Sequence, residues 1–135
     1  MPTGVHPGCV LVGQGHQRLS EGLRGLLQAS FEGVFIVADQ PSLIDGAHKL
    51  QPALMVIDLA LAGGAVASLL AELRNQAPRS CTLLLSDYED PRVDSAALAA
   101  GADGVVHKAT LATDLSRAVD AVLAGRRFTS PPGTH

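Results

Sequence analysis

The chain has 135 residues, of which 47% are hydrophobic and 17% charged, and its formal net charge is −3. This length and composition fit one folded domain with a sizeable core and exclude disorder for most of the chain. Lys and Arg are scattered instead of forming the basic stripe of a nucleic-acid-binding domain. No apolar run approaches the roughly 18 residues that a membrane span needs, and residues 1–8 are too polar for a signal peptide. We therefore expect a cytoplasmic protein whose domain contacts neither membranes nor nucleic acid directly.

Short apolar runs alternate with segments of helical periodicity along the chain. We expect strands over residues 10–13, 34–38, 54–58, 81–86 and 104–107, and helices over 16–29, 41–50, 65–76, 91–100 and 111–123. Five strand–helix alternations predict a doubly wound α/β domain, with a five-stranded parallel sheet covered by helices on both faces.

The domain organisation follows from the same pattern. Residues 1–8 are expected to be an N-terminal extension, 9–125 the folded domain, and 126–135 a linker or disordered tail, since Thr-Ser-Pro-Pro-Gly has little to bury. Cys9 and Cys81 each begin a predicted strand and are interpreted as small buried residues. The five histidines lack the spacing of a zinc site.

Three polar residues mark the ends of predicted strands. Asp58 ends the run Leu-Met-Val-Ile-Asp, Ser86 ends a second apolar run, and Lys108 directly follows a third. Because the carboxyl ends of parallel strands meet at one edge of the sheet, we expect these side chains to share a pocket. A carboxylate, a hydroxyl and an ammonium group together indicate a phosphoryl-accepting site.

In this order and spacing, the chain resembles a response-regulator receiver domain, of the type attached to LuxR-type helix-turn-helix regulators. The matching segments are 10–12 with His16, 20–27, 56–59, 84–86, 101–104 with Lys108, and 124–128 with 130–131, the last resembling the start of a linker toward a DNA-binding domain. The resemblance implies a flavodoxin-like fold, Asp58 as phosphoacceptor and Ser86 and Lys108 as pocket residues. It also implies a histidine kinase or other signalling protein as partner, and a homodimer formed through the fourth helix, fifth strand and last helix. The domain would be regulatory and not an enzyme, acting on a transcriptional or other output.

The chain departs from the family pattern at the metal site and at the switch. Gln14 and Gly15 stand where the family places two acidic residues that hold Mg²⁺ with the phosphoacceptor, and Val105 stands at the position of the switch aromatic. Mg²⁺ prefers carboxylate and water oxygens in near-octahedral geometry. The resemblance is therefore to a degenerate receiver, for which we expect weak Mg²⁺ binding through Asp58 at most. We also expect impaired aspartyl phosphorylation and a lasting ion pair between Asp58 and Lys108.

A second interpretation is a small-molecule or nucleotide-binding α/β module. Gly13-Gln14-Gly15 between a strand and a helix is half of a dinucleotide-binding fingerprint, and Asp39 follows the second strand at the place of a ribose-binding acid. Arg18 at the third glycine position argues against it, since its bulk hinders close helix–strand packing.

Overall fold

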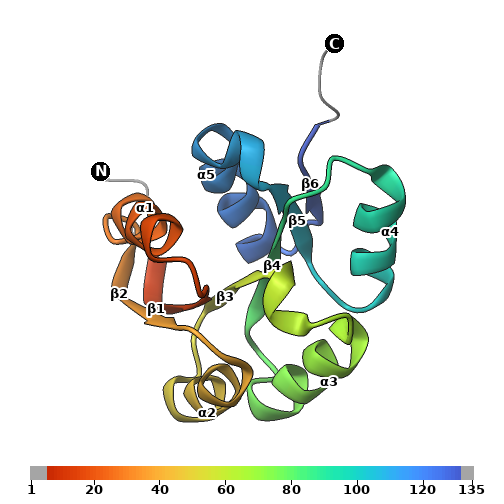
Figure 1. Cartoon of the computed structure of the whole chain (residues 1–135). Helices are drawn as coiled ribbons and strands as arrows, with labels where there is room; N and C mark the ends of the chain where they lie inside the picture. The colour runs from red at the N-terminus through yellow and green to blue at the C-terminus, as the bar shows by residue number, and fades with distance from the viewer. Residues whose placement is uncertain (1–5, 132–135) are drawn as a thin grey trace.

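The centre of the computed structural model, which describes residues 6–131, is a parallel sheet of six strands in the order β2-β1-β3-β4-β5-β6 (Figure 1). The strands are β1 His6–Gly13, β2 Phe31–Val37, β3 Leu54–Asp58, β4 Cys81–Ser86, β5 Gly104–His107 and β6 Phe128–Thr129. The helices are α1 Gln17–Leu27, α2 Gln40–Leu50, α3 Val66–Gln76, α4 Pro91–Ala99 and α5 Leu111–Leu123, with 3₁₀ turns η1 Leu59–Ala62 and η2 Lys108–Thr110. The strand order reverses at β1, so the crevice between the ends of β1 and β3 is where such folds bind ligands.

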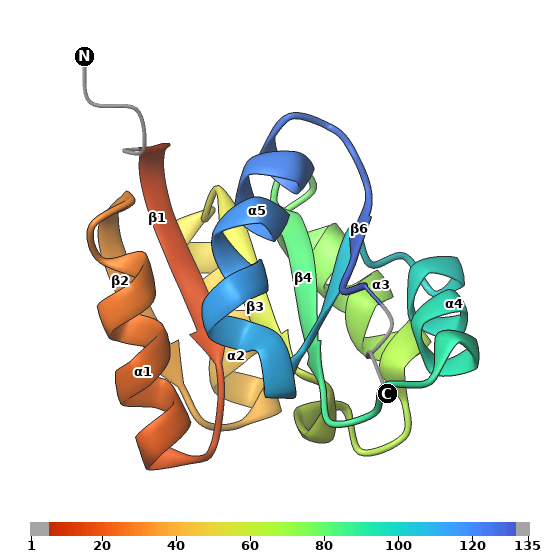
Figure 2. The ribbon, with the colours of Figure 1, turned by 90° about the horizontal axis from the view of Figure 1, so that it is seen from above.

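Helices cover both faces of this sheet. α1 and α5 lie side by side on one face, and α2, α3 and α4 cover the other (Figures 1 and 2). Two apolar clusters fill the two layers, the first built with Leu23 and Leu115, the second with Leu43, Leu70 and Ala97. Every residue of β3 is buried, as expected for a strand covered on both faces. The predicted doubly wound α/β fold is confirmed.

The number of strands and the nature of the C-terminal segment differ from the prediction. β6 pairs in parallel with β5, with Phe128 beside Gly104 and Thr129 beside Val105, so the sheet has six strands instead of five. Ser130 is only 4% exposed. The sheet thus extends past the expected boundary at residue 125, and the described part of the expected linker or disordered tail is ordered. Residues 132–135 lie outside the described part.

The N-terminal strand is also longer than predicted. β1 begins at His6, whose backbone N–H donates to the carbonyl of Ser30 over 2.6 Å, so the predicted extension over residues 1–8 runs into the sheet. The strand register shifts between His6 and Cys9, where Gly8 adopts a φ of +90° that favours glycine. Residues 1–5 lie outside the described range. Within residues 6–131 no helix has the length and apolar character to cross a membrane.

Candidate functional site

The candidate site is a pocket at the carboxyl edge of the sheet. Asp58 is the last residue of β3, Gln14 and Gly15 follow β1 directly, and Lys108 is the first residue after β5. The register that pairs Gly13 with Ile57 brings the residues following both close together. The pocket has a volume of about 820 Å³ and is lined by Gln14, Gly15, His16, Arg18, Leu19, Asp58, Ala60, Leu61, Asp87 and Lys108.

Each carboxylate oxygen of Asp58 accepts at least one hydrogen bond. Its Oδ2 accepts from Gln14 Nε2 and from Lys108 Nζ, each over 2.7 Å, and its Oδ1 accepts from the backbone N–H of Ala60 over 2.9 Å. The side chain is almost wholly buried, at 5% exposure. Burial raises the pKa of Asp58, but the hydrogen bonds from Lys108, Ala60 and Gln14 outweigh it, so the pKa lies below the ordinary value. The carboxylate is therefore ionised and satisfied by groups of this chain.

Gln14 is oriented by a second contact at its other end. Its Oε1 accepts from the backbone N–H of His16 over 2.8 Å, and the residue is 3% exposed. Because the carbonyl oxygen faces that N–H, the amide NH₂ must face Asp58. Gln14 is thus a fixed donor toward the carboxylate of Asp58.

Lys108 bridges two carboxylates. Besides Asp58, its Nζ lies 3.2 Å from Oδ1 and 3.3 Å from Oδ2 of Asp87, which is exposed at the pocket mouth. Burial lowers the pKa of Lys108, but the hydrogen bonds to Asp58 and Asp87 raise it by more. The pKa of Lys108 therefore lies above the ordinary value. The predicted pairing of Lys108 with Asp58 is present.

Ser86, expected to share the pocket, and Val105, at the position of the switch aromatic, lie apart from this cluster. Ser86 ends β4 and is 1% exposed, but its hydroxyl donates to the carbonyl of Tyr88 and accepts from the N–H of Tyr88, over 3.2 and 3.0 Å. Val105 is 1% exposed and packs in the apolar cluster under α2, α3 and α4. The structure therefore brings together Asp58, Lys108 and Gln14 and leaves Ser86 and Val105 outside their hydrogen-bond network.

The groups around Asp58 do not fit a Mg²⁺ site. Mg²⁺ requires several oxygen ligands, and Gly15 has no side chain while the single side-chain oxygen of Gln14 is already bonded to His16. The ammonium group of Lys108 stands 2.7 Å from the one carboxylate. Among residues 6–131 there is no group of three or more His, Cys, Asp or Glu side chains that could hold a metal. The side chains around Asp58 therefore supply a donor and a cation where a divalent metal would need oxygen ligands.

The glycine-rich loop has no open cradle for a nucleotide. A Cβ at Gly13 would lie 3.0 Å from Leu61 and 3.3 Å from Leu43. The space beside this glycine is therefore filled by this chain's own side chains. Asp39 accepts from the N–H of Ser42 over 2.8 Å and caps α2. Both features that suggested nucleotide binding have local structural roles.

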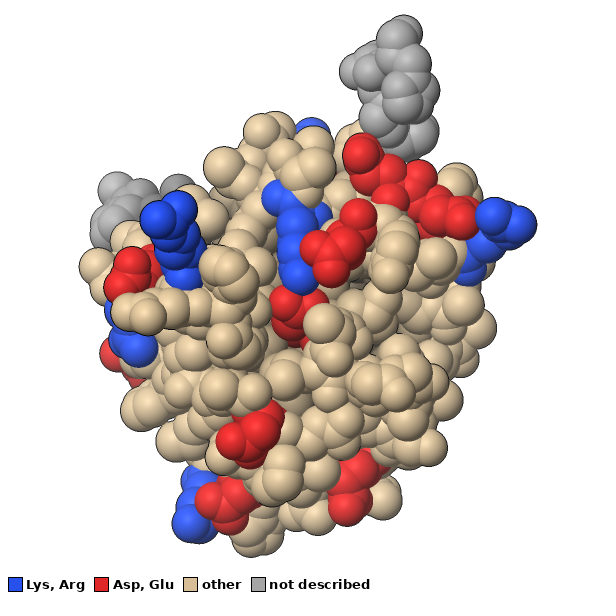
Figure 3. Space-filling view, in the orientation of Figure 1, with Lys and Arg blue, Asp and Glu red and all other residues tan. Residues whose placement is uncertain are grey.

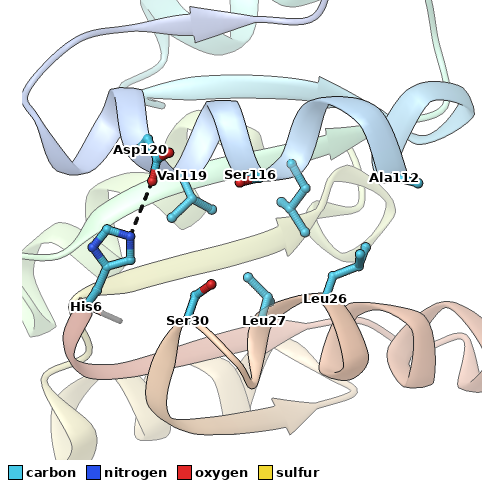
Figure 4. Close-up of a pocket in the computed structure, with 9 residues that line it drawn as sticks. His6, Leu26, Leu27, Ser30, Ala112, Ser116, Val119 and Asp120 are labelled. Carbon is cyan, nitrogen blue, oxygen red and sulfur yellow. Dashed lines mark ion pairs between the residues drawn. The ribbon is translucent and has the colours of Figure 1, made fainter. Parts of the chain in front are cut away.

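A second hollow of about 500 Å³ lies between α1 and α5 (Figure 4). His6 points across it to Asp120, with Nε2 3.4 Å from Oδ1. Leu26, which the helical periodicity places with the core-facing leucines of α1, is 44% exposed and lines this groove. On the face shown in Figure 3, basic side chains stand apart and are interspersed with acidic ones, with no continuous basic surface among the residues drawn.

Sequence reasoning missed a buried polar pair beside the site. His107, the last residue of β5, places Nε2 3.0 and 3.2 Å from the two oxygens of Asp94 in α4, and both residues are buried. The available signal was a histidine that ends an otherwise apolar buried strand. Asp87 was missed also, although it directly follows Ser86.

Comparison with known proteins gives relatives of one kind. No family model matches the chain. The transcriptional regulatory protein RcsB of Escherichia coli strain K12 is 28% identical over 126 residues, which cover 89% of this chain and 58% of RcsB, so the chain spans less than two thirds of that relative. The isolated receiver (REC) domain of RcsB from Salmonella enterica serovar Typhimurium, in its apo form, superposes with a TM-score of 0.76 at 27% identity, covering 93% of this chain and 94% of that domain.

This chain folds as a receiver domain. A LuxR-family two-component response regulator from Aurantimonas sp. SI85-9A1 agrees with it, at a TM-score of 0.83 and 26% identity over 93% of this chain and 91% of that one. The chain is therefore similar, in sequence and in fold, to the receiver domain of RcsB and to a LuxR-family response regulator. The flavodoxin-like topology expected from the sequence is confirmed.

Proposed function

We propose that this receiver domain works with little or no Mg²⁺-dependent phosphorylation and controls its output through protein–protein contacts. The observation that carries the proposal is the hydrogen bond from Gln14 to Asp58, together with the ion pair from Lys108, both over 2.7 Å. Phosphoryl transfer needs positive charge to neutralise the phosphoryl oxygens, which a divalent metal commonly supplies. Here the position of the metal ligands holds an amide donor, and the ammonium group of Lys108 is already bound to the acceptor carboxylate.

Asp58 remains the phosphoacceptor position in this proposal, with Lys108 beside it in the pocket, while the hydroxyl of Ser86 is bonded to Tyr88. An attack by Asp58 on a phosphodonor would require the carboxylate oxygen to give up its contacts with Gln14 and Lys108. Those contacts are made by Oδ2; an attack by Oδ1 would instead require the loss of its contact with the N–H of Ala60. The readout is also altered, since Val105 is aliphatic and fully packed and cannot swing as an aromatic ring does. Receipt of a phosphoryl group is thus weakened by the contacts of Gln14 and Lys108, and its transmission by Val105.

The output that we propose is transcriptional, because RcsB, which aligns with 89% of this chain, is named a transcriptional regulatory protein. A histidine kinase or another signalling protein would be the upstream partner, and a second copy of the chain the partner in a homodimer. On α5, one of the elements expected to form the dimer surface, apolar residues such as Leu115 and Val122 are buried in the core at 2% exposure each. A dimer would therefore use the exposed side chains of α4 and α5, since every residue of β5 is buried.

Incubation with Mg²⁺ and acetyl phosphate, followed by intact-mass measurement, tests the proposal. We expect the protein to remain almost entirely unmodified. A stoichiometric phosphoryl adduct that is absent from the Asp58→Ala variant would overturn it. Thermal unfolding with added nucleotides tests the alternative of a nucleotide-binding module, for which stabilisation by a nucleotide would be required.

A further inference from the structure

The last residue of β5 and the residue after it connect three parts of the molecule. The Lys108 side chain binds Asp58 in the pocket over 2.7 Å. The His107 side chain binds Asp94 of α4 over 3.0 Å. The backbone N–H of His107 donates to the hydroxyl of Ser130, directly after β6, over 2.9 Å. Pocket, helix α4 and C-terminal segment therefore converge on two consecutive residues.

We propose that His107 couples the Asp58 pocket to α4 and to the C-terminal segment, in place of a switch aromatic. A shift of Lys108 toward or away from Asp58 moves the peptide that joins it to His107. The imidazole and the backbone N–H of His107 then carry that shift along two separate branches, one to Asp94 and one to Ser130. The inference rests on the proposed receiver role, but its test requires no phosphorylation, so either can fail alone.

The helix branch has the features of a contact that can exist in two arrangements. His107 and Asp94 are 2% and 7% exposed, so their contact is shielded from water and strongly dependent on geometry. Nδ1 of His107 is buried and has no hydrogen-bond partner among the residues the structure describes. An unsatisfied buried ring nitrogen lowers the stability of the arrangement shown, which favours local opening at this point.

The C-terminal branch is held by a second buried carboxylate. Asp114 in the first turn of α5 is 2% exposed and accepts from Thr110 over 2.5 Å and from Arg117 over 2.9 Å. Burial raises the pKa of Asp114, but hydrogen bonds from Thr110, Ser130 and Arg117 lower it by more. The pKa therefore lies below the ordinary value and the group stays ionised. Ser130 bonds twice to β5, its hydroxyl accepting from the N–H of His107 and its own N–H donating to the carbonyl of Val105, so the segment after β6 is fixed against the sheet.

Hydrogen exchange measured by mass spectrometry on the whole chain tests the two branches. The pocket is perturbed by Asp58→Asn, and exchange is followed in α4 and in residues 128–130. We expect the substitution to speed exchange in both regions by about tenfold, which corresponds to about 1.4 kcal/mol of local stability. Asp39→Ala, which removes the cap of α2, is the control for general destabilisation and should leave α4 no more affected than the other helices.

Two further backgrounds separate the branches. In His107→Leu/Asp94→Asn, which leaves no unpaired buried charge, Asp58→Asn should no longer speed exchange in α4 but should still speed it in residues 128–130. In the Ser130→Ala background, Asp58→Asn should still speed exchange in α4 but should no longer speed it in residues 128–130. The proposal is overturned if Asp58→Asn affects α4 equally with and without the histidine, or affects neither region in the unaltered chain.

Discussion

Gln14 and Asp58 lie at the ends of neighbouring strands, and the side-chain amide of Gln14 donates to Oδ2 of Asp58 over 2.7 Å. The amide cannot turn over, because its oxygen accepts from the N–H of His16. This chain therefore holds a fixed donor against the carboxylate of Asp58. The consequences of this contact for metal binding, stability and pH dependence can each be measured.

Restoring the acidic pair should restore phosphorylation. Gln14→Asp/Gly15→Asp removes the donor and supplies two carboxylates beside Asp58, the ligand type that Mg²⁺ prefers. Gly15 accepts a side chain, since a Cβ there would meet only the carbonyl of Ala38 at 3.6 Å. We expect an acetyl phosphate adduct by intact mass that depends on Mg²⁺. Gly15→Ala is the matched control and should stay unmodified; an adduct level equal to the control would contradict the prediction.

Asp58→Asn should destabilise the domain although it is nearly isosteric. Gln14, Lys108 and Ala60 all donate to Asp58, and an asparagine replaces one acceptor oxygen with a donor. An unsatisfied buried donor costs about 1–3 kcal/mol, which we expect as the loss in the free energy of unfolding measured in urea. Asp45→Asn, which alters an exposed pair with Lys49, serves as control and should change stability by less than about 0.5 kcal/mol.

The stabilising effect of Asp58 should depend on pH in one direction. Its pKa is lowered in the folded state, so the folded protein binds this proton less readily than the unfolded chain does. Its contribution is therefore complete above the ordinary aspartate pKa, about 3.9, and is lost as pH falls through the lower folded value. The difference in unfolding free energy between the natural chain and Asp58→Asn should be largest near pH 7 and narrow below about pH 4. A difference that stays constant over this range would show that the carboxylate charge is not involved.

Two glycine substitutions should act in opposite directions. A Cβ at Gly104 in β5 would lie 2.7 Å from Leu83 and 3.0 Å from the carbonyl of Phe128 in β6, so Gly104→Ala should cost about 1–3 kcal/mol of stability. Gly22 in α1 has open space at the same position, and Gly22→Ala should stabilise the helix by about 0.5–1 kcal/mol. Urea unfolding of both variants checks the pair. An unaffected Gly104→Ala variant would mean that β6 is not seated against β5.

Much of the fold follows from local patterns in the sequence. β3 and β4 are predicted at their observed bounds because a strand buried on both faces is a continuous apolar run between breaks. β6 is not predicted, since two residues between Arg127 and Ser130 have no periodicity and gain their place only from the open edge of β5. The start of β1 is missed for a related reason, because the proline and glycine at residues 7 and 8 resemble an unstructured start.

The candidate site is predictable in part. Strand ends alone place Asp58 and Lys108 together. The contact from Gln14 depends on the register of β1 against β3 and on the N–H of His16, which no local pattern reveals. The pair of His107 with Asp94 joins a strand to a helix that precedes it in the chain, so it too is visible only in the folded structure.

The central claim is that the hydrogen-bonding groups of the pocket are satisfied by its own side chains. Its most direct test is to measure the ¹³C chemical shift of the Asp58 side-chain carboxyl carbon by NMR during titration with Mg²⁺. The account predicts no saturable change in its chemical shift at millimolar Mg²⁺, because Gln14 and Lys108 occupy the carboxylate. The Gln14→Asp/Gly15→Asp variant should show one in the same titration. A saturable shift in the natural chain would contradict the account.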